Sequence, residues 1–443
     1  MAYPFICLSI YIHYLGGKSM RKKKGLGGLL FTVVLALSLI LTGCSGSNSE
    51  SASGESGDVT LRILVWNNNP EGTKLEGDIF KEFEKENPGI KVKQVYAPYD
   101  KFNDKFLTMS AGGDQPDLVW LQPSAFGQFV SKGVLMDLSD KEIKEDEYMP
   151  NVLSLGQVDG KQYALIRDAS AFMLGYNKDM FDAAGVEYPK DDWTWEDFLA
   201  AAQKLTVEKD GKTVQFGMEN FYTNELLVEN GGGFVSQDGK EVIIDSPESV
   251  EAIKFGADLI NKYHVQPTTA QSQGLSNMFL AGQAAMKMMG PWDWSDTAKN
   301  ATFKWDVVPL PAGKAGNVAA ASYLPIGIGS GTKHPDEAYK LLQFLSTGKG
   351  QDLQVDTISA VPVVKRNEDK IETMANAPEN AKALSTILAE GRTVMNAPYI
   401  PEYAEIVSKI QPVIDNINLN GSKDAEKQLK KVADQIRKEY GLK

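Results

Sequence analysis

The sequence has little cysteine and little histidine, and both shortages limit what the protein can be. Only two cysteines occur, Cys7 and Cys44. Cys7 falls in a segment that we predict to be absent from the mature protein, so no internal disulfide can form. The fold must then rely on burial of apolar side chains, for which 400 residues are ample. Only His264 and His334 follow the predicted leader, which leaves little material for a histidine-based triad or metal site.

Motifs of common enzyme and ion-binding classes are also missing. Residues 231–234, GGGF, lack the lysine and the hydroxyl residue of a phosphate-binding loop, and no D-x-D-x-D-G calcium loop occurs. Neighbouring acids such as Asp191 and Asp192 lie in polar stretches, which is typical of solvated surfaces. Spacing alone leaves open a glycoside hydrolase with two facing acids. We predict no cofactor, no metal site and no catalytic residue.

Positive charge is scarce as well, because the net charge of the chain is -12. Removal of residues 1–43 takes away five cations and no acid, which leaves a net charge of about -17. Such an acidic surface disfavours nucleic acid and anionic lipid as partners.

One long apolar run does occur, and its surroundings predict an export signal. Residues 22–44 read KKKGLGGLLFTVVLALSLILTGC, a basic cluster followed by an uncharged apolar run and small residues before a cysteine. This is the order of a secretory signal. The final LTGC resembles a bacterial lipobox, in which Cys44 is lipidated and becomes the first mature residue. The alternative is an uncleaved anchor, because the run approaches the ~20 residues of a transmembrane helix, although its glycines weaken that alternative.

The segments around this signal are predicted to lie outside the folded body. Residues 1–19 precede a good start at Met20 and are interpreted as an upstream extension, and 20–43 are interpreted as the signal peptide. Residues 44–58 are rich in Ser, Gly and Glu, which predicts a flexible tether because they can bury little. We therefore expect a lipid-anchored protein on the extracellular face of the cell membrane, in a bacterium of the Gram-positive type.

The folded body begins with alternating strand and helix patterns. Residues 60–66 and 90–95 have strand character, and apolar residues at helical spacing in 75–83 lie between them. The pattern repeats around the strand expected at 117–121. Repeated strand–helix–strand units predict an α/β fold with a parallel sheet, in which ligands bind outside the carboxyl ends of the strands.

The folded body resembles the extracellular solute-binding proteins of ATP-driven importers, specifically the family 1 group that includes maltose-binding protein. The likeness runs in the family's order through nearly all of the chain after residue 59. It is carried by the phrases FEKENPGIKV (83–92), GGDQPDLVW (112–120), GKQYALIRD (160–168), GYNKDMFDAAGV (175–186), TWEDFLAAAQKLT (194–206), FLAGQAAMKMMGPWDW (279–294) and KHPDEAYKLLQFL (333–345).

The resemblance implies a two-lobed periplasmic-binding-protein-like fold of type II, with a ligand cleft between hinged α/β lobes. Carried over to this chain, residues 59–168 and 324–365 would form the N-terminal lobe. Residues 169–323 and 366–443 would form the C-terminal lobe. The family usually works as monomers, and we expect the same here.

Trp292 is the leading candidate for a ligand contact. We expect residues 279–289 to form a helix that Gly290 and Pro291 end, leaving Trp292 at its mouth. A tryptophan face suits the C–H surface of a sugar ring, while a nearby carboxylate such as Asp293 binds hydroxyl groups. In the family, the matching tryptophan stacks on the ligand. The alternative is a packing tryptophan, the role that we expect for Trp294.

Two strand ends supply further candidates. Trp66, Asn67 and Asn68 follow the first strand, and asparagine offers both a donor and an acceptor to a hydroxyl-rich ligand. The alternative is an ordinary turn, for which asparagine is also favoured. Trp120 and Gln122 follow another strand end, and core packing is the alternative for Trp120.

Asp168 falls where the chain should cross between lobes, and it could accept paired hydrogen bonds from neighbouring sugar hydroxyls. The alternative is a surface ion pair between Arg167 and Asp168, which would contribute little. The family often has a proline before this basic–acidic pair, whereas this chain has Ile166. Tyr323 at the returning crossover and Tyr399 are further candidates, and for both a packing role is the alternative.

The resemblance implies a binding lipoprotein that is not an enzyme. It would capture a carbohydrate, a disaccharide or oligosaccharide, and deliver it to the permease of an ABC importer. Three alternatives stay open from the sequence: a glycerol phosphate ligand, a polyamine ligand, and a sensory or adhesive lipoprotein without transport. A phosphate would call for clustered Arg or Lys in the cleft. The candidate residues include only Arg167.

Overall fold

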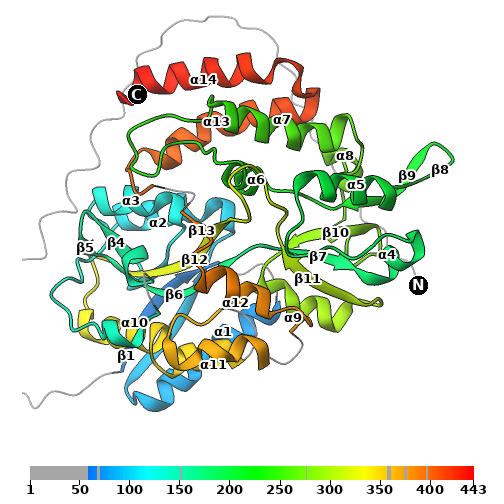
Figure 1. Cartoon of the computed structure of the whole chain (residues 1–443). Helices are drawn as coiled ribbons and strands as arrows, with labels where there is room; N and C mark the ends of the chain where they lie inside the picture. Colours follow the sequence, from blue (N-terminus) through cyan, green and yellow to red (C-terminus); the bar gives the residue numbers. More distant parts are fainter. Residues whose placement is uncertain are drawn as a thin grey trace, which may run out of the picture. The chain divides into compact units, whose positions relative to one another are not determined.

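The computed structural model describes residues 58–66, 70–149, 152–275, 277–356, 361–373, 377–395 and 398–443 (Figure 1). The predicted leader, the lipidation residue Cys44 and the candidates Asn67 and Asn68 lie outside these residues. No helix of the part that is described is both long and apolar enough to span a membrane.

The first sheet has six strands, and its centre is parallel. The strand order is β13-β12-β3-β1-β2, with β6 also paired to β12. Strand β1 pairs in parallel with β2 and β3, whereas β12 runs antiparallel to β3 and β6. The strands are β1 (Val59–Val65), β2 (Ile90–Tyr96), β3 (Leu118–Trp120), β6 (Ala164–Ala171), β12 (Ala319–Ile328) and β13 (Thr393–Val394).

Helices that pack on this sheet bury one apolar face. In α1, Ile79, Phe80 and Phe83 are buried, while Asp78 on the exposed side pairs with lysines one turn away. This is the division expected of an amphipathic helix at the surface of a core. The helices whose residues share this core are α1 (Pro70–Glu86), α2 (Phe102–Ala111), α3 (Pro123–Ser131) and α10 (Pro335–Ser346), with α11 (Lys349–Asp356) beside α1 and α10.

The second sheet has five strands in the order β11-β7-β10-β9-β8. Strands β9 and β10 are parallel, and the remaining pairs are antiparallel. Its strands are β7 (Met173–Asn177), β8 (Val207–Lys209), β9 (Lys212–Met218), β10 (Ala284–Met289) and β11 (Trp305–Pro309). Its helices are α4 (Lys178–Ala184), α5 (Trp195–Leu205), α6 (Thr223–Glu229), α7 (Pro247–Asn261), α8 (Thr269–Ser272) and α9 (Pro291–Asn300).

The end of the chain packs mainly with the core of the second sheet. Helix α13 (Tyr403–Asn420) contacts α7 and α14 (Ala425–Tyr440), and Figure 1 shows α13 and α14 beside α7 at the top of the view. Helix α12 (Lys382–Ala389) contacts β6 and β11. The short elements are β4 (Gln157–Val158), β5 (Lys161–Gln162) and the 3-10 turns η1 (Tyr99–Lys101), η2 (Glu145–Glu147), η3 (Leu153–Gly156), η4 (Lys365–Thr373) and η5 (Ser422–Asp424).

At the first crossing between the sheets, a single residue, Phe172, connects them. Strand β6 ends at Ala171 in the first sheet, and β7 begins at Met173 in the second. The returning strand β12 pairs with β6 from Ala321 to Gly327, with a register shift between Leu324 and Pro325. Each sheet therefore has its own strand order and core, and the β6–β12 pair lies where the chain passes between them. These features confirm the predicted α/β architecture with two sheets.

The expected helix over residues 279–289 is wrong. Residues 284–289 form the buried strand β10, and helix α9 begins only at Pro291. All six residues of β10 are buried, and a strand covered on both faces has no alternation in its sequence to distinguish it from a helix. Trp292 therefore lies at the start of a helix rather than at the end of one.

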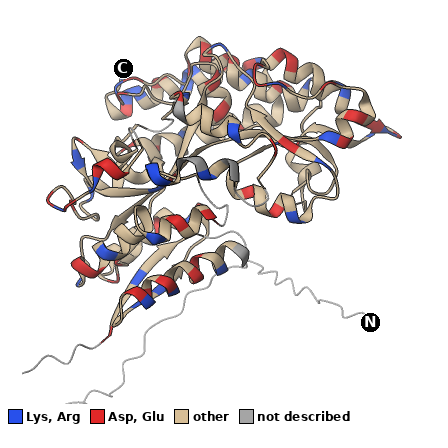
Figure 2. Cartoon of the chain, turned by 60° about the horizontal axis from the view of Figure 1, so that its bottom comes forward, with Lys and Arg blue, Asp and Glu red and all other residues tan. Residues whose placement is uncertain are grey.

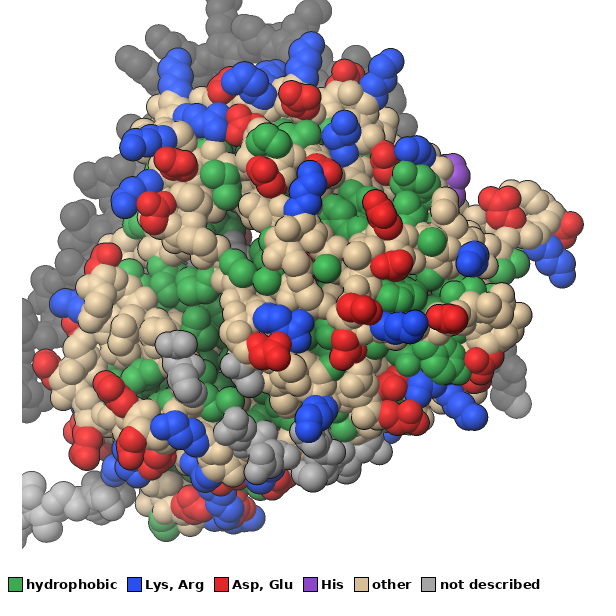
Figure 3. Space-filling view, viewed as in Figure 1, with side chains coloured by type: hydrophobic (Ala, Val, Ile, Leu, Met, Phe, Trp, Pro, Cys, Tyr) green, Lys and Arg blue, Asp and Glu red, His purple; other side chains and the backbone are tan. Residues whose placement is uncertain are grey.

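Acidic and basic side chains are mixed over the surface (Figure 2). On the face shown in Figure 3, neither sign of charge forms a continuous patch among the described residues.

Candidate functional site

Four aromatic side chains meet at the carboxyl ends of β1 and β3. The Trp66 ring centroid lies 5.3 Å from that of Tyr99, 4.8 Å from that of Phe102 and 5.1 Å from that of Trp120. All three contacts are edge-to-face, the arrangement that the ring quadrupoles favour. We call these four residues the first aromatic cluster.

The sheet topology explains why these residues meet. Trp66 directly follows β1, and Trp120 is the last residue of β3. Because β1 and β3 are parallel neighbours, their carboxyl ends lie at the same edge of the sheet, which is where ligands bind in such folds. Trp66 keeps part of its surface exposed, whereas Trp120 is only 4% exposed.

Gln122 forms hydrogen bonds that hold the segment of Tyr99 in this cluster. Its Nε2 donates to the carbonyl of Tyr99 at 2.6 Å, and its Oε1 accepts from Asn103 Nδ2 at 2.8 Å. The side chain is buried. Both ends of the amide are thus used within the protein, and a direct ligand contact by Gln122 stays a prediction.

The surface ion pair between Arg167 and Asp168, considered above as an alternative, is not found. Arg167 is 1% exposed, and its Nη2 lies 2.7 Å from Glu76 Oε1 of α1. Its guanidinium carbon lies 5.2 Å from the Trp120 ring centroid. Alternation in β6 separates the two neighbouring side chains, because successive residues of a strand point to opposite faces.

Asp168 accepts a hydrogen bond from Gln354 Nε2 at 3.1 Å. Burial raises the pKa of this carboxyl to about 6, and the nearby Arg167 partly opposes the shift. The side chain nevertheless keeps some exposed surface. The Asp168 carboxylate is therefore largely desolvated but still reaches the surface.

A second aromatic group lies beside the crossover. The Phe172 ring centroid is 5.3 Å from that of Trp292 and 5.4 Å from that of Tyr222. Trp292 is 42% exposed, so a large apolar face is open to solvent. We call these three residues the second aromatic cluster.

Topology again brings these side chains together. Strands β9 and β10 are parallel neighbours, so their carboxyl ends lie at one edge of the second sheet. Met289 at the end of β10 lies opposite Met173 at the start of β7, which places Phe172 beside the turn into α9. Pro291 occupies the first turn of α9, and Asp293 Oδ2 accepts from the Gly290 backbone N–H at 3.1 Å, which fixes the helix start.

Polar groups surround this second cluster. Asp293 Oδ1 lies 3.7 Å from Lys287 Nζ, and Glu219, which follows β9, accepts from the Phe279 backbone N–H at 2.8 Å. Burial raises the pKa of both the Asp293 and the Glu219 carboxyl groups, and Lys287 partly opposes each shift. Among the residues that the structure describes, the buried Asn220 Oδ1 has no hydrogen-bond partner.

Tyr323 and Tyr399 are brought together by a hydrogen bond between their hydroxyl groups, not by contact of their rings. Their hydroxyl oxygens lie 2.5 Å apart, and Tyr399 donates to the Leu155 carbonyl at 2.6 Å. Tyr323 must then be the donor to Tyr399. Burial raises the pKa of both hydroxyl groups. This chain of hydrogen bonds links β12 to the segment before α13.

Sequence reasoning missed several members of both clusters. Tyr99, Phe172 and Tyr222 lie in short turns or at single-residue crossovers, where no periodic pattern marks them. Glu219 and Asn220 had a usable signal, because they follow the strand pattern of Lys212–Met218 at its carboxyl end.

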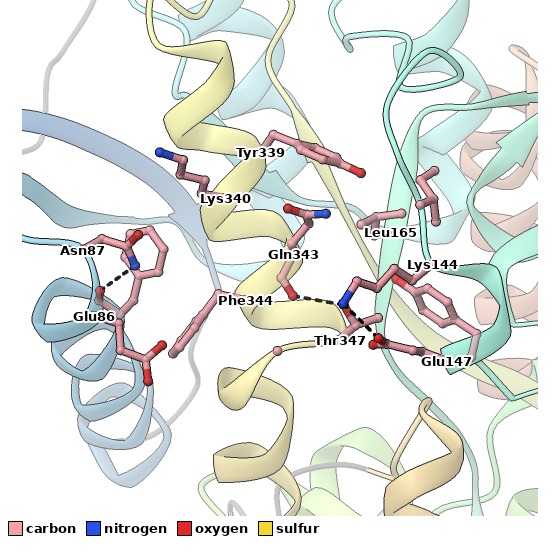
Figure 4. A pocket seen from close by; sticks show the side chains of 14 residues that line it. Glu86, Asn87, Lys144, Glu147, Leu165, Tyr339, Lys340, Gln343, Phe344 and Thr347 are labelled. Carbon is pink, nitrogen blue, oxygen red and sulfur yellow. Dashed lines mark hydrogen bonds and ion pairs between the residues drawn. The ribbon is translucent and has the colours of Figure 1, made fainter.

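A hollow of about 340 Å³ lies elsewhere, between the end of α1, helix α10 and residues 143–148 (Figure 4). Figure 4 shows Gln343 and Phe344 on α10 beside it, and Lys144 forms a 3.0 Å ion pair with Glu147 at its edge. No member of the two aromatic clusters lines this hollow. It is therefore a feature distinct from the strand-end site.

Comparison with known proteins adds a family match and three similar proteins. Residues 66–352 match the model of the bacterial extracellular solute-binding protein family. The chain is 30% identical to an ABC substrate-binding protein from Listeria monocytogenes solved in complex with cycloalternan, over 87% of this chain and 100% of that one, with a TM-score of 0.79. It is 28% identical to the arabinooligosaccharide-binding protein of Bacillus subtilis over 72% of this chain and 75% of that protein. It is also 25% identical to the maltodextrin-binding protein of the same organism over 86% and 90%, respectively.

Proposed function

We propose that this chain, which belongs to the bacterial extracellular solute-binding protein family, captures a disaccharide or oligosaccharide and delivers it to the permease of an ABC importer. Proteins of this family bind their solute without converting it, so the chain is not an enzyme. The relatives named for arabinooligosaccharide and maltodextrin, and the structure with cycloalternan, all support a carbohydrate ligand.

The observation that carries the proposal is the pair of aromatic clusters at the carboxyl ends of parallel strands. Trp66 and Trp292 each present partly exposed indole surface. A flat aromatic ring packs on the C–H face of a pyranose or furanose, and carboxylates such as Asp168, Asp293 and Glu219 accept hydrogen bonds from the hydroxyl groups. One such cluster in each sheet suits a ligand of more than one sugar unit.

Charge at the site favours a neutral ligand over a phosphate ester. Arg167 already faces Glu76 at 2.7 Å, and Lys287 already faces Asp293 at 3.7 Å. A phosphate needs cations that are not neutralised by neighbouring acids. The glycerol phosphate alternative is thereby weakened, whereas the polyamine alternative is left to experiment.

The proposed mechanism is closure of two lobes around the ligand. One lobe would comprise residues 59–168 and 324–365, and the other would comprise 169–323 and 366–443. A ligand that contacts both aromatic clusters would favour the closed form, because it binds that form more tightly. The permease would then recognise the closed protein.

We further propose that lipid at Cys44 anchors the protein outside the cell membrane. The LTGC motif and the Ser/Gly-rich segment 44–58 support this anchor. A tether of this composition lets the folded body move while its end stays at the membrane.

The test is a thermal-shift screen of the chain from residue 45 onward against a panel of saccharides, polyamines and phosphate esters. A ligand that binds the native state and not the unfolded chain raises the melting temperature by an amount that grows with the ratio of its concentration to its Kd. We expect a specific oligosaccharide to raise it and glycerol phosphates to have no effect. A shift with a polyamine or a phosphate ester, and none with any saccharide, would contradict the proposal.

A further inference from the structure

The buried ion pair behind Trp120 is the least expected feature of the candidate site. Arg167 of β6 and Glu76 of α1 are 1% and 5% exposed, respectively, and they face each other at 2.7 Å. Removing two charges from water costs several kcal/mol per ion in a real protein. An arrangement of this kind needs either full satisfaction by hydrogen bonds or a role other than stability.

Hydrogen bonding around the pair is incomplete. Considering the described ranges, Glu76 Oε2 is buried with no hydrogen-bond partner, and the 2.7 Å contact of Arg167 Nη2 lacks hydrogen-bond geometry. Trp120 Nε1 and Asn103 Oδ1 are also buried without a hydrogen-bond partner there. A pair that served stability alone would be replaced by apolar side chains of similar size at little or no cost.

Arg167 contacts two candidate ligand-binding residues, Trp120 directly and Asp168 through Gln354. The guanidinium lies over the Trp120 ring at 5.2 Å, within the range of a cation–π interaction. Its Nε donates to Gln354 Oε1, and Gln354 Nε2 donates to Asp168 Oδ2 at 3.1 Å. Gln351 Nε2 donates to the backbone carbonyl of Arg167, which holds β6 against α11.

The guanidinium of Arg167 thus packs over the Trp120 ring. Through the side-chain amide of Gln354 it also orients the Asp168 carboxylate. We propose that Arg167 is a positioning residue that fixes Trp120 and Asp168 for carbohydrate binding, with Glu76 as the counterion that holds it in place. The inference rests on the proposed carbohydrate-binding function and deepens it. Lysine cannot substitute, because a point charge lacks both the planar face over Trp120 and the Nε donor to Gln354.

The test compares three proteins with the wild type. Arg167→Lys keeps the charge. The double variant Glu76→Leu with Arg167→Met removes both charges and keeps the apolar volume, so that it folds even if the lysine variant does not. Lys178→Met is the control at a different ion pair. Lys178, the first residue of α4, lies 3.2 Å from the buried Asp306 of β11 and 2.7 Å from the exposed Glu379, away from Trp120.

Affinity is measured by calorimetry with whichever of maltotriose, arabinotriose or cycloalternan most raises the melting temperature of the wild type. We expect both Arg167 variants to bind at least about tenfold more weakly, which corresponds to about 1.4 kcal/mol. The control should melt at a lower temperature and bind as the wild type does. Unchanged affinity in the double variant, or an equal loss in the control, would overturn the inference.

A readout without ligand separates this inference from the proposed function. Subtracting the emission of a Trp120→Phe protein isolates the fluorescence of Trp120, and the same subtraction is made in the Arg167→Lys background. We expect the emission of Trp120 to change when the guanidinium is lost. If no saccharide binds the wild type, the proposed function fails while this comparison still stands. Identical difference spectra would reject the positioning role.

Discussion

At the scale of single residues, neighbouring side chains have opposite surroundings. Trp292 is 42% exposed beside Phe172, whereas Trp294, two residues later in α9, is fully buried. Both tryptophans belong to the same short phrase, GPWDW. Only the helix that begins at Pro291 turns one ring outward and the other into the core.

We predict that Trp292→Ala weakens saccharide binding by ~1–2 kcal/mol, the order expected for one aromatic contact, and leaves the melting temperature nearly unchanged. Trp294→Ala is the matched control, because loss of a fully buried tryptophan costs ~3–5 kcal/mol of stability. Calorimetric binding and thermal melts of both variants check the prediction. Wild-type affinity in Trp292→Ala would assign that residue to the surface rather than to the ligand.

Asp168 makes a second prediction at this scale, concerning pH. Its pKa is raised to about 6, so its carboxylate accepts hydroxyl hydrogen bonds above that pH and loses an acceptor below it. We expect saccharide affinity to fall as the pH drops through 6, and Asp168→Asn to bind more weakly, by about tenfold, without this pH dependence. Titration calorimetry from pH 4.5 to 7.5 measures both proteins.

The stability of the protein should depend on the ionisation of Asp168 with the opposite sign: as the pH drops, saccharide affinity falls while the stability contribution of Asp168 rises. The folded pKa of Asp168 lies above its ordinary value of 3.8, so this group contributes most stability below pH 4 and loses it as the pH rises through 6. A binding profile that merely followed stability would therefore have the opposite sign to the one that we predict.

At the scale of elements, helix α6 is tied to the strand that returns between the sheets. Glu225 Oε2 accepts from the Ala320 backbone N–H of β12 at 2.9 Å, and Glu229 Oε2, one turn later, accepts from Trp195 Nε1 at 2.7 Å. Both carboxyl groups are buried. Burial raises the pKa of Glu225 to about 8 and that of Glu229 well above its usual range.

We predict that the stability contributed by Glu225 falls with rising pH, because burial disfavours its ionised form. Because the folded pKa of Glu225 is above its ordinary value of 4.5, its contribution to stability is complete below pH 4.5 and is lost as the pH rises through 8. Glu225→Gln, which keeps the acceptor without a titrating group, should melt with less dependence on pH between 5 and 8.5. Identical pH profiles for both proteins would contradict the assignment.

At the scale of the whole molecule, two sheets with separate cores are joined at Phe172 and along the β6–β12 pair. Asp168, Phe172 and Tyr323 all lie in or next to this crossover. A ligand that contacts both aromatic clusters is then bound beside the segments that any closure must bend.

Membrane attachment is a prediction for the entire chain. We expect Cys44→Ala, made in the producing cell, to release the protein into the medium with unchanged affinity for saccharide, because Cys44 is not one of the candidate ligand contacts. Cell fractionation followed by binding measurements tests this. Retention of the variant at the membrane would instead favour an uncleaved apolar anchor.

Much of the first sheet could be predicted from the sequence. The patterns at 75–83 and 90–95 correspond to α1 and β2, because these elements have an exposed face and thus a periodic pattern. The short apolar run at 60–66 corresponds to β1. Strand β10 has no such periodic pattern, since it is buried on both sides, and its apolar sequence therefore predicts a helix as readily as a strand.

The sequence by itself determined the class of protein, because ordered family phrases, an export signal and alternating elements are local features of the chain. Only the tertiary structure decided which side chains meet. Arg167 pairs with Glu76 rather than with its neighbour Asp168, and Phe172 contacts Trp292 across 120 positions of sequence. Such contacts depend on which strands are parallel neighbours and on which face each residue occupies, and neither is encoded in any short stretch of the chain.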